Sequence, residues 1–213
     1  MSNKLYTYGI VEQEGLELDV EGVGGAESIY TVDYRALSAV VSDIDTTDPE
    51  RTDDAVEAHN DVLQRVLEYD GGRTIVPMSF GMAFKNGRTL KGVLRGAQRA
   101  LRSTLNDIDS TVELGVKVID SGEDETAEEI AQAGMTDRLS EASINETEND
   151  LFSDRLIVNK SYLVDREHRD EFDAAIDTIR SAHDDVTVQY TGPWPPYNFV
   201  DIHIGTDQQR GGR

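Results

Sequence analysis

The chain has 213 residues, of which 38% are hydrophobic, enough for one large or two small domains with a modest core. It carries 42 acidic and 20 basic residues, a formal net charge of −22, and such a surface repels nucleic acid backbones and anionic lipid. Cysteine is absent, which excludes disulfides, thiolate catalysis and Cys-ligated metal centres.

The acidic composition also indicates an environment. Like charges strain a compact fold at ordinary ionic strength, so the composition favours a salt-rich cytoplasm in which the Debye length falls to roughly 3 Å. An acidic protein of a mesophile is the alternative. No run reaches the roughly 18 apolar residues of a membrane helix, and the opening MSNKLYTYGI lacks the order of a signal peptide. We therefore expect a halophilic, cytoplasmic protein.

The first 119 residues predict an α+β domain. Three strand-like runs come first: LYTYGIV, SIYTVDY and LSAVVSDI. The spacing then predicts a helix, with a capping box at Thr47 and Glu50 and with Gly71-Gly72 at its end. Its apolar face would consist of Val56, His59, Val62, Leu63, Val66 and Leu67. A short strand, Thr74 to Pro77, follows the helix.

A second amphipathic helix is expected after Asn86, which is placed to cap it. One face is apolar: Leu90, Val93, Leu94, Ala97, Ala100, Leu101 and Leu105. The other face is basic, and we call it the basic stripe: Arg88, Lys91, Arg95, Arg99 and Arg102. After the helix, TVELGVKVI alternates apolar and polar residues, which is typical of a half-buried strand.

The basic stripe stands out because no acidic residue lies between Met82 and Asn106. One interpretation is structural, with the stripe paired to acids elsewhere in the same chain. The other is a docking face for an acidic partner or for residues 120 to 150 of this chain, in which charge sets the register more than the affinity. Nucleic acid is disfavoured as the partner, because no aromatic residue interleaves the stripe.

The segment PMSFGMAF, residues 77 to 84, concentrates Met and Phe. Flexible thioethers suit adaptable apolar binding surfaces, and they also suit a domain core. On the first interpretation Met78, Phe80, Met82 and Phe84 would contact an apolar partner. On the second they would be buried.

Residues 120 to 150 carry eleven acidic residues and one base, Arg138, with poor periodicity. We expect an acidic linker or a weakly packed helical arm here. A smaller domain is expected from 151 to 205, with strands at RLIVNKSYLV, DVTVQYTG and NFVDIHIG, and with a helix that Asp165 caps. Strands with helices on one face favour a ferredoxin-like sandwich. Residues 206 to 213 are expected to form a disordered tail.

Motifs of enzymatic chemistry are absent from the sequence. The chain has no phosphate-binding Gly-rich loop, no HExxH helix and no Gly-x-Ser-x-Gly elbow. His59 lies beside the apolar face of its helix, which favours a packed, hydrogen-bonded histidine over a metal ligand. Asp201 and His203 share one strand face, but no further ligand flanks them closely. We therefore expect no catalytic, cofactor or metal site.

Near the C-terminus, GPWPP gathers the only Trp and three of the five Pro. Proline lacks the amide donor and biases the preceding residue toward extended geometry, so the segment suits a sheet edge and not its centre. We expect Pro193, Trp194, Pro195 and Pro196 to form a structural clamp with the indole anchored between prolines. A PxxP ligand for an SH3-like domain is the alternative.

Several stretches taken together resemble one known family. LYTYGIV, HNDVLQRVLE followed by TIVPMSFGMAF, then VELGVKV, NKSYLV and GPWPPYNFV resemble the GvpL/GvpF family of gas vesicle proteins over roughly residues 4 to 202. The order of the segments makes the resemblance specific, and the acidic segment is its least characteristic part. The short length and the composition look most like a haloarchaeal member.

The resemblance implies two α/β domains, the second ferredoxin-like, and a non-enzymatic role as an accessory or minor structural component of gas vesicles. It implies contacts with the apolar shell protein GvpA and with other accessory Gvp proteins. A charged partner that covers apolar shell-protein surface would keep that protein soluble. We expect no nucleic acid, membrane or small-molecule partner. Two alternatives remain: a shell component without chaperone-like action, and an enzyme or small-molecule binder on a ferredoxin-like scaffold.

Overall fold

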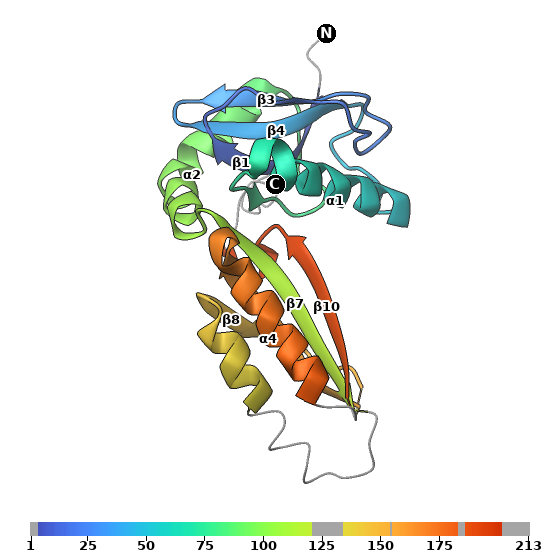
Figure 1. Cartoon of the computed structure of the whole chain (residues 1–213). Coiled ribbons are helices and arrows are strands. Elements are labelled where there is room, and N and C mark those ends of the chain that lie inside the picture. Colours follow the sequence, from blue (N-terminus) through green and yellow to red (C-terminus); the bar gives the residue numbers. More distant parts are fainter. Residues whose placement is uncertain (1–3, 121–133, 154, 183–185, 202–213) are drawn as a thin grey trace, which may run out of the picture. The chain divides into compact units, whose positions relative to one another are not determined.

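The computed structural model describes residues 4–120, 134–153, 155–182 and 186–201 (Figure 1). Its contacts divide the chain into two compact units. Unit 1 holds the described residues up to Asp109 together with Val200 and Asp201, and unit 2 runs from Ser110 to Phe199. Each unit combines one antiparallel sheet with helices, which confirms the expected mixed α/β architecture with two sheets.

Unit 1 is built on a sheet with the strand order β2-β3-β4-β1-β5, and β6 also pairs with β1. The strands are β1 Lys4–Glu12, β2 Glu17–Leu18, β3 Ile29–Tyr34, β4 Leu37–Ile44, β5 Val76–Pro77 and β6 Ala83–Phe84. The three long strands coincide with the three β-branched and aromatic runs of the sequence, as β propensity predicts.

Two long helices cover opposite faces of this sheet, α1 Asp53–Glu68 and α2 Gly87–Asp107. Val41 of β4 lies in the apolar cluster that the buried leucines of α2 form. Ser42 follows it, and its hydroxyl bonds to that of Tyr8, whose ring stacks on His59 of α1. Because neighbouring residues of a strand point to opposite faces, α1 and α2 lie on different sides.

Both helices begin at side-chain caps. Asn86 caps α2 as predicted, with its Oδ1 accepting a backbone N–H at 3.0 Å. The capping box predicted for α1 at Thr47 and Glu50 is wrong. The cap is Thr52, whose hydroxyl oxygen accepts a backbone N–H at 3.2 Å. Thr52 is favoured because Asp53–Asp54 directly behind it also place negative charge at the positive end of the helix dipole.

The apolar faces are largely those predicted. The buried residues of the two helices are His59, Val62, Leu63, Val66 and Leu67 in α1 and Leu90, Leu94, Leu101 and Leu105 in α2. Ala100 is exposed, contrary to the prediction. It precedes the buried Leu101 by one residue, so it lies about 100° further round the helix, beyond the edge of the buried face.

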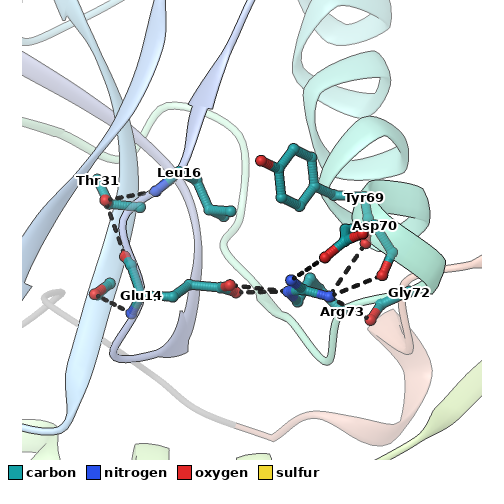
Figure 2. Close-up of polar contacts among 8 residues, drawn as sticks. Glu14, Leu16, Thr31, Tyr69, Asp70, Gly72 and Arg73 are labelled. Carbon is teal, nitrogen blue, oxygen red and sulfur yellow. Dashed lines mark hydrogen bonds and ion pairs between the residues drawn. The ribbon is translucent and has the colours of Figure 1, made fainter.

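Arg73 fixes the turn that ends α1 (Figure 2). Asp70, Gly71 and Gly72 have φ values of 45°, 85° and 117°, a left-handed stretch that breaks the helix. The guanidinium of Arg73 donates to three carbonyls of this turn, and its Nε donates to both carboxylate oxygens of Glu14 at 2.8 and 3.1 Å. Arg73 thus ties the end of α1 to the chain that precedes β2, and the bond to Glu14 raises the pKa of the guanidinium.

Unit 2 is a four-stranded sheet with the order β10-β7-β9-β8. Its elements are β7 Thr111–Asp120, a helix described over 134–141, β8 Asn145–Glu148, β9 Leu156–Asp165, the 3-10 turn η2 Arg166–His168, α4 Arg169–Ala182, β10 Val186–Trp194 and the 3-10 turn η3 Tyr197–Phe199. The alternation in β7 is confirmed, because Val112, Leu114, Val116 and Val118 are all buried. Phe172 of α4 packs on this face, with its ring 5.2 Å from that of Tyr162 in β9.

Unit 2 begins earlier than the expected boundary after residue 119, because β7 pairs with both β9 and β10. The expected acidic arm is partly packed. Met135 and Leu139 are buried, and β8 pairs with β9. The strand expected from residue 198 does not start there, since Tyr197–Phe199 form η3. The tail expected at 206 to 213 lies outside the described residues.

Candidate functional site

The five residues of the basic stripe lie on α2, the helix labelled in Figure 1. All five of its residues are exposed, whereas the four leucines of the opposite side are buried against the sheet. The Asn86 cap and the packing of those leucines fix how α2 is rotated about its axis. Packing therefore directs every cation of the stripe to solvent.

No residue of the stripe makes an ion pair with another residue of the described chain. Bases elsewhere in the described chain do pair, as Arg73 does with Glu14 and Lys160 with Glu146. The structural interpretation of the stripe, neutralisation by acids of the same chain, therefore finds no support among the described residues. What remains is a positive surface on a protein with a net charge of −22.

The C-terminal half of the stripe is hollowed. One depression is lined by Gln98, Arg99, Arg102, Ser103 and Asn106, and a second by Glu12, Gln13, Ala36, Leu37, Arg102, Leu105 and Asn106. Arg102 and Asn106 line both. Arg35, which follows β3, donates to Gln98 at 3.1 Å and so brings a further cation beside the helix. This end of the stripe offers guanidinium and amide donors to an acidic side chain.

Two glycines lie on the exposed side of α2 beside the stripe. Gly92 and Gly96 are exposed, and a Cβ built on either would meet nothing within 4 Å. Glycine in a helix interior costs about 1 kcal/mol relative to alanine. The described chain therefore shows no packing reason for either glycine, although both weaken the helix that carries the stripe.

Segment 77–84 is buried at its first two residues and half-buried from Phe80 to Phe84. Met78 is 5% exposed, so it is not available to a partner, and that part of the sequence-based expectation is wrong. Met82 and Phe84 are half-buried against the apolar cluster of unit 1. Phe80 is also half-buried, with its ring 6.0 Å from that of Tyr6 and with Arg51 over its face. These side chains pack inward because β5 and β6 attach the segment to β1.

His59 joins this segment to α1. Its Nε2 donates to the carbonyl of Met78 at 3.1 Å, which leaves Nδ1 to accept from the hydroxyl of Tyr6 at 2.9 Å. The Tyr6 oxygen in turn accepts from the backbone N–H of Gly81 at 3.1 Å. The pKa of His59 is lowered to about 4, chiefly by burial and in smaller part by the charge of Arg51, while the hydrogen bond to Met78 opposes the shift. Both ring nitrogens are used, so His59 is a packed, hydrogen-bonded histidine, as the sequence favoured.

Within the described residues, no group of three or more His, Asp or Glu is arranged to hold a metal ion. Asp201 is exposed, and its proposed companion His203 lies outside the described residues.

The structure corrects the expected clamp around Trp194. The residue is 45% exposed at the end of β10, an edge strand as predicted, so the indole is not anchored between prolines. Pro195 and Pro196 are the buried members of the segment, and the bond from Gly192 to Pro193 is cis. The indole points away from the core because Trp194 pairs with Glu113, on the β7 face opposite the buried valines.

Asn198 ties down this end of the chain instead. Its backbone N–H and its side-chain Nδ2 donate to the two carboxylate oxygens of Glu113 at 2.9 and 2.5 Å, and Nδ2 also donates to Ser161 at 3.0 Å. Glu113 is only 5% exposed, although the alternation of β7 placed it on the polar face. The sequence gives only a weak indication of this contact, a single Asn two positions after Pro196.

The family model described as "Gas vesicle synthesis protein GvpL/GvpF" matches residues 4–132 and 122–201. The chain belongs to the GvpL/GvpF family of gas vesicle synthesis proteins. Gas vesicle protein F of Haloferax mediterranei is 74% identical over 212 residues, covering 99% of this chain and all of that protein. Gas vesicle protein F1 of Halobacterium salinarum is 71% identical over 213 residues, the full length of both.

Membership of the GvpL/GvpF family agrees with the fold and the composition. The crystal structure of GvpF from Anabaena shares the fold with a TM-score of 0.83 at 18% identity, covering 95% of this chain and all of that one. Relatives from haloarchaea confirm the halophilic interpretation of the acidic surface. No helix among the described residues is long and apolar enough to cross a membrane.

Proposed function

We propose that this GvpL/GvpF protein acts in the cytoplasm as an accessory protein of gas vesicle assembly. It binds the apolar shell protein GvpA, together with other accessory Gvp proteins, and prevents aggregation of GvpA while a vesicle nucleates. The observation that carries the proposal is the basic stripe, an exposed helix face with no ion partner among the described residues. Such a face is suited to orient a protein of opposite charge.

The acidic remainder of the surface supports the same role. An apolar shell subunit aggregates when its contact surface is open to water, and a partner with a net charge of −22 would keep the complex dispersed. Phe80, Met82 and Phe84 are half-buried, so they can give at most a small apolar contact beside the stripe. Met78 is buried and offers GvpA no contact.

We also propose a ferredoxin-like fold for unit 2. Its elements follow the order strand, helix, strand, strand, helix, strand, with the spatial strand order β10-β7-β9-β8 and antiparallel pairing throughout. We propose no catalytic activity for the chain. In unit 1, His59 has a lowered pKa, but it is a core residue with both ring nitrogens hydrogen-bonded, and neither depression beside α2 includes it.

The test is capture of purified GvpA by the full chain in multi-molar KCl. The intact chain should retain GvpA and lower its light scattering, whereas Arg95→Glu/Arg99→Glu should lose both effects because it reverses the charge at the centre of the stripe. The matched control is Arg65→Glu/Arg138→Glu, which makes the same charge change at two exposed positions outside α2. Phe80→Ser, with its folding checked by circular dichroism, tests whether an apolar contact contributes to the capture of GvpA.

Failure of the intact chain to capture GvpA would refute the proposed function. Equal capture by the intact chain and by Arg95→Glu/Arg99→Glu would keep the function and remove the stripe from it. Capture without lower light scattering would favour a structural shell component over a chaperone-like one.

A further inference from the structure

We infer that the partner segment docked on α2 is an acidic α-helix lying along the basic stripe. The inference rests on the proposed function, since this helix belongs to the gas vesicle protein that docks there, and it adds the chemistry and shape of the bound segment. The stripe, the hollowed end of α2 and the two exposed glycines carry it.

The spacing of the cations selects a helix. Arg88, Arg95 and Arg102 repeat every seven residues, and Lys91 and Arg99 fill the intervals. A seven-residue repeat keeps one face aligned with a neighbouring helix, as in helix pairs that pack side by side. Fourteen residue steps from Arg88 to Arg102 give a rise of about 21 Å, so the partner helix needs about four turns.

High salt requires that the charges be in contact. The Debye length is roughly 3 Å at 1 M salt, so an acid held further from a guanidinium gains little. An extended strand repeats its side chains every two residues and would fall out of step with cations spaced three and four apart. A helix with Asp or Glu at the same intervals meets each cation in turn.

Gly92 and Gly96 explain how close the helices can come. They lie one turn apart on the exposed side of α2, and the space over each is open. Where such residues face a partner helix, the backbones approach closely and the flanking arginines can reach carboxylates on the other helix. At the far end, the depressions that share Arg102 and Asn106 would receive the last acidic side chains.

The experiment uses the full chain and a stapled helical peptide of about four turns. The peptide carries Glu at the intervals of the stripe and a fluorescent label, and a second stapled peptide has the same composition with its Glu residues spread around the helix. Fluorescence anisotropy is measured in multi-molar KCl. We expect the matched peptide to bind at least about tenfold more tightly than the spread one.

Substitutions in the full chain complete the test. Arg95→Glu/Arg99→Glu should abolish binding of the matched peptide, and Arg65→Glu/Arg138→Glu should not change it. Gly96→Leu should weaken binding at least about tenfold, whereas Gly96→Ala should keep it and raise the melting temperature of the chain. A Cβ at position 96 would meet nothing within 4 Å in the described part of the chain, and leucine is a better helix former than glycine. Loss of binding in Gly96→Leu with a melting temperature that is not lowered therefore reports the docked helix.

Equal binding of the two peptides, or full binding by Gly96→Leu, would overturn the inference. Preference for a single-stranded oligonucleotide over the matched peptide would also overturn it, and so would self-association of the chain through α2. Binding of the matched peptide without capture of GvpA would uphold the acidic helix and reject the proposed function. Capture of GvpA by the intact chain and equally by Gly96→Leu would uphold the proposed function and reject the acidic helix.

Discussion

Protonation of His59 should destabilise unit 1. The ring is 2% exposed, and its two nitrogens link Tyr6 to the carbonyl of Met78. A proton on Nδ1 would remove the acceptor of the Tyr6 hydroxyl and would put a charge into the core. Burial accordingly lowers the pKa of His59 from 6.5 to about 4.

The size of the effect follows from these two pKa values. Above pH 6.5 the histidine is neutral in both the folded and the unfolded chain, so His59 adds no pH dependence. Between pH 6.5 and about 4 the unfolded chain binds the proton and the folded chain does not, so stability falls as the pH falls. Between about pH 7.5 and about pH 5 the loss amounts to about 2 kcal/mol.

The assay is urea unfolding at constant ionic strength over this pH range, with His59→Phe as the control. Phenylalanine keeps an aromatic ring beside Tyr8 and Phe80 but has no proton to gain. The unmodified chain should lose about 2 kcal/mol more than the variant, because the carboxylates and the other histidines are common to both. Parallel pH dependences in the two proteins would refute the buried, neutral state of His59.

Two further perturbations test contacts that the structure revealed. Asn198→Ala leaves the buried carboxylate of Glu113 without its side-chain donor and should cost about 2 to 4 kcal/mol in a denaturant titration; a loss below that of Trp194→Ala would contradict its role. Trp194→Ala should cost about 1 to 2 kcal/mol, since nearly half of the residue is exposed. Arg73→Ala should cost about 1 to 2 kcal/mol through loss of the pair with Glu14, a value reduced by partial exposure; an unchanged unfolding midpoint would show that the turn after α1 does not need it.

Local patterns accounted for much of the fold. α2 was predicted with its cap at Asn86, because the cap and the leucine spacing lie within one segment. The three long strands of unit 1 and the alternation of β7 were predicted for the same reason. The basic stripe could be predicted because its charges recur every three or four residues within one helix. All five are exposed, since the leucines of the same helix face the sheet.

The missed features depend on partners far apart in the chain. Asn198 and Glu113 are separated by 85 residues, and nothing in either neighbourhood announces the other. The start of unit 2 was placed too late because β7 follows α2 in the chain but pairs with β9 and β10. Composition alone cannot distinguish an apolar surface from a core, so it leaves the location of Met78 open. The pairing of β5 with β1 buries it.

In a salt-rich cytoplasm the basic stripe can act on a partner only at direct contact, and it cannot attract one from a distance. At low ionic strength the summed field of the protein, with a net charge of −22, would act on acidic proteins from a distance, but salt at molar concentration screens charges beyond roughly 3 Å. The cations of the stripe also find no acids within the described part of their own chain, despite a net charge of −22. Their remaining effect is on groups that touch them. A face of this kind discriminates between partners by the spacing of their carboxylates, and the open positions at Gly92 and Gly96 add a limit on side-chain size.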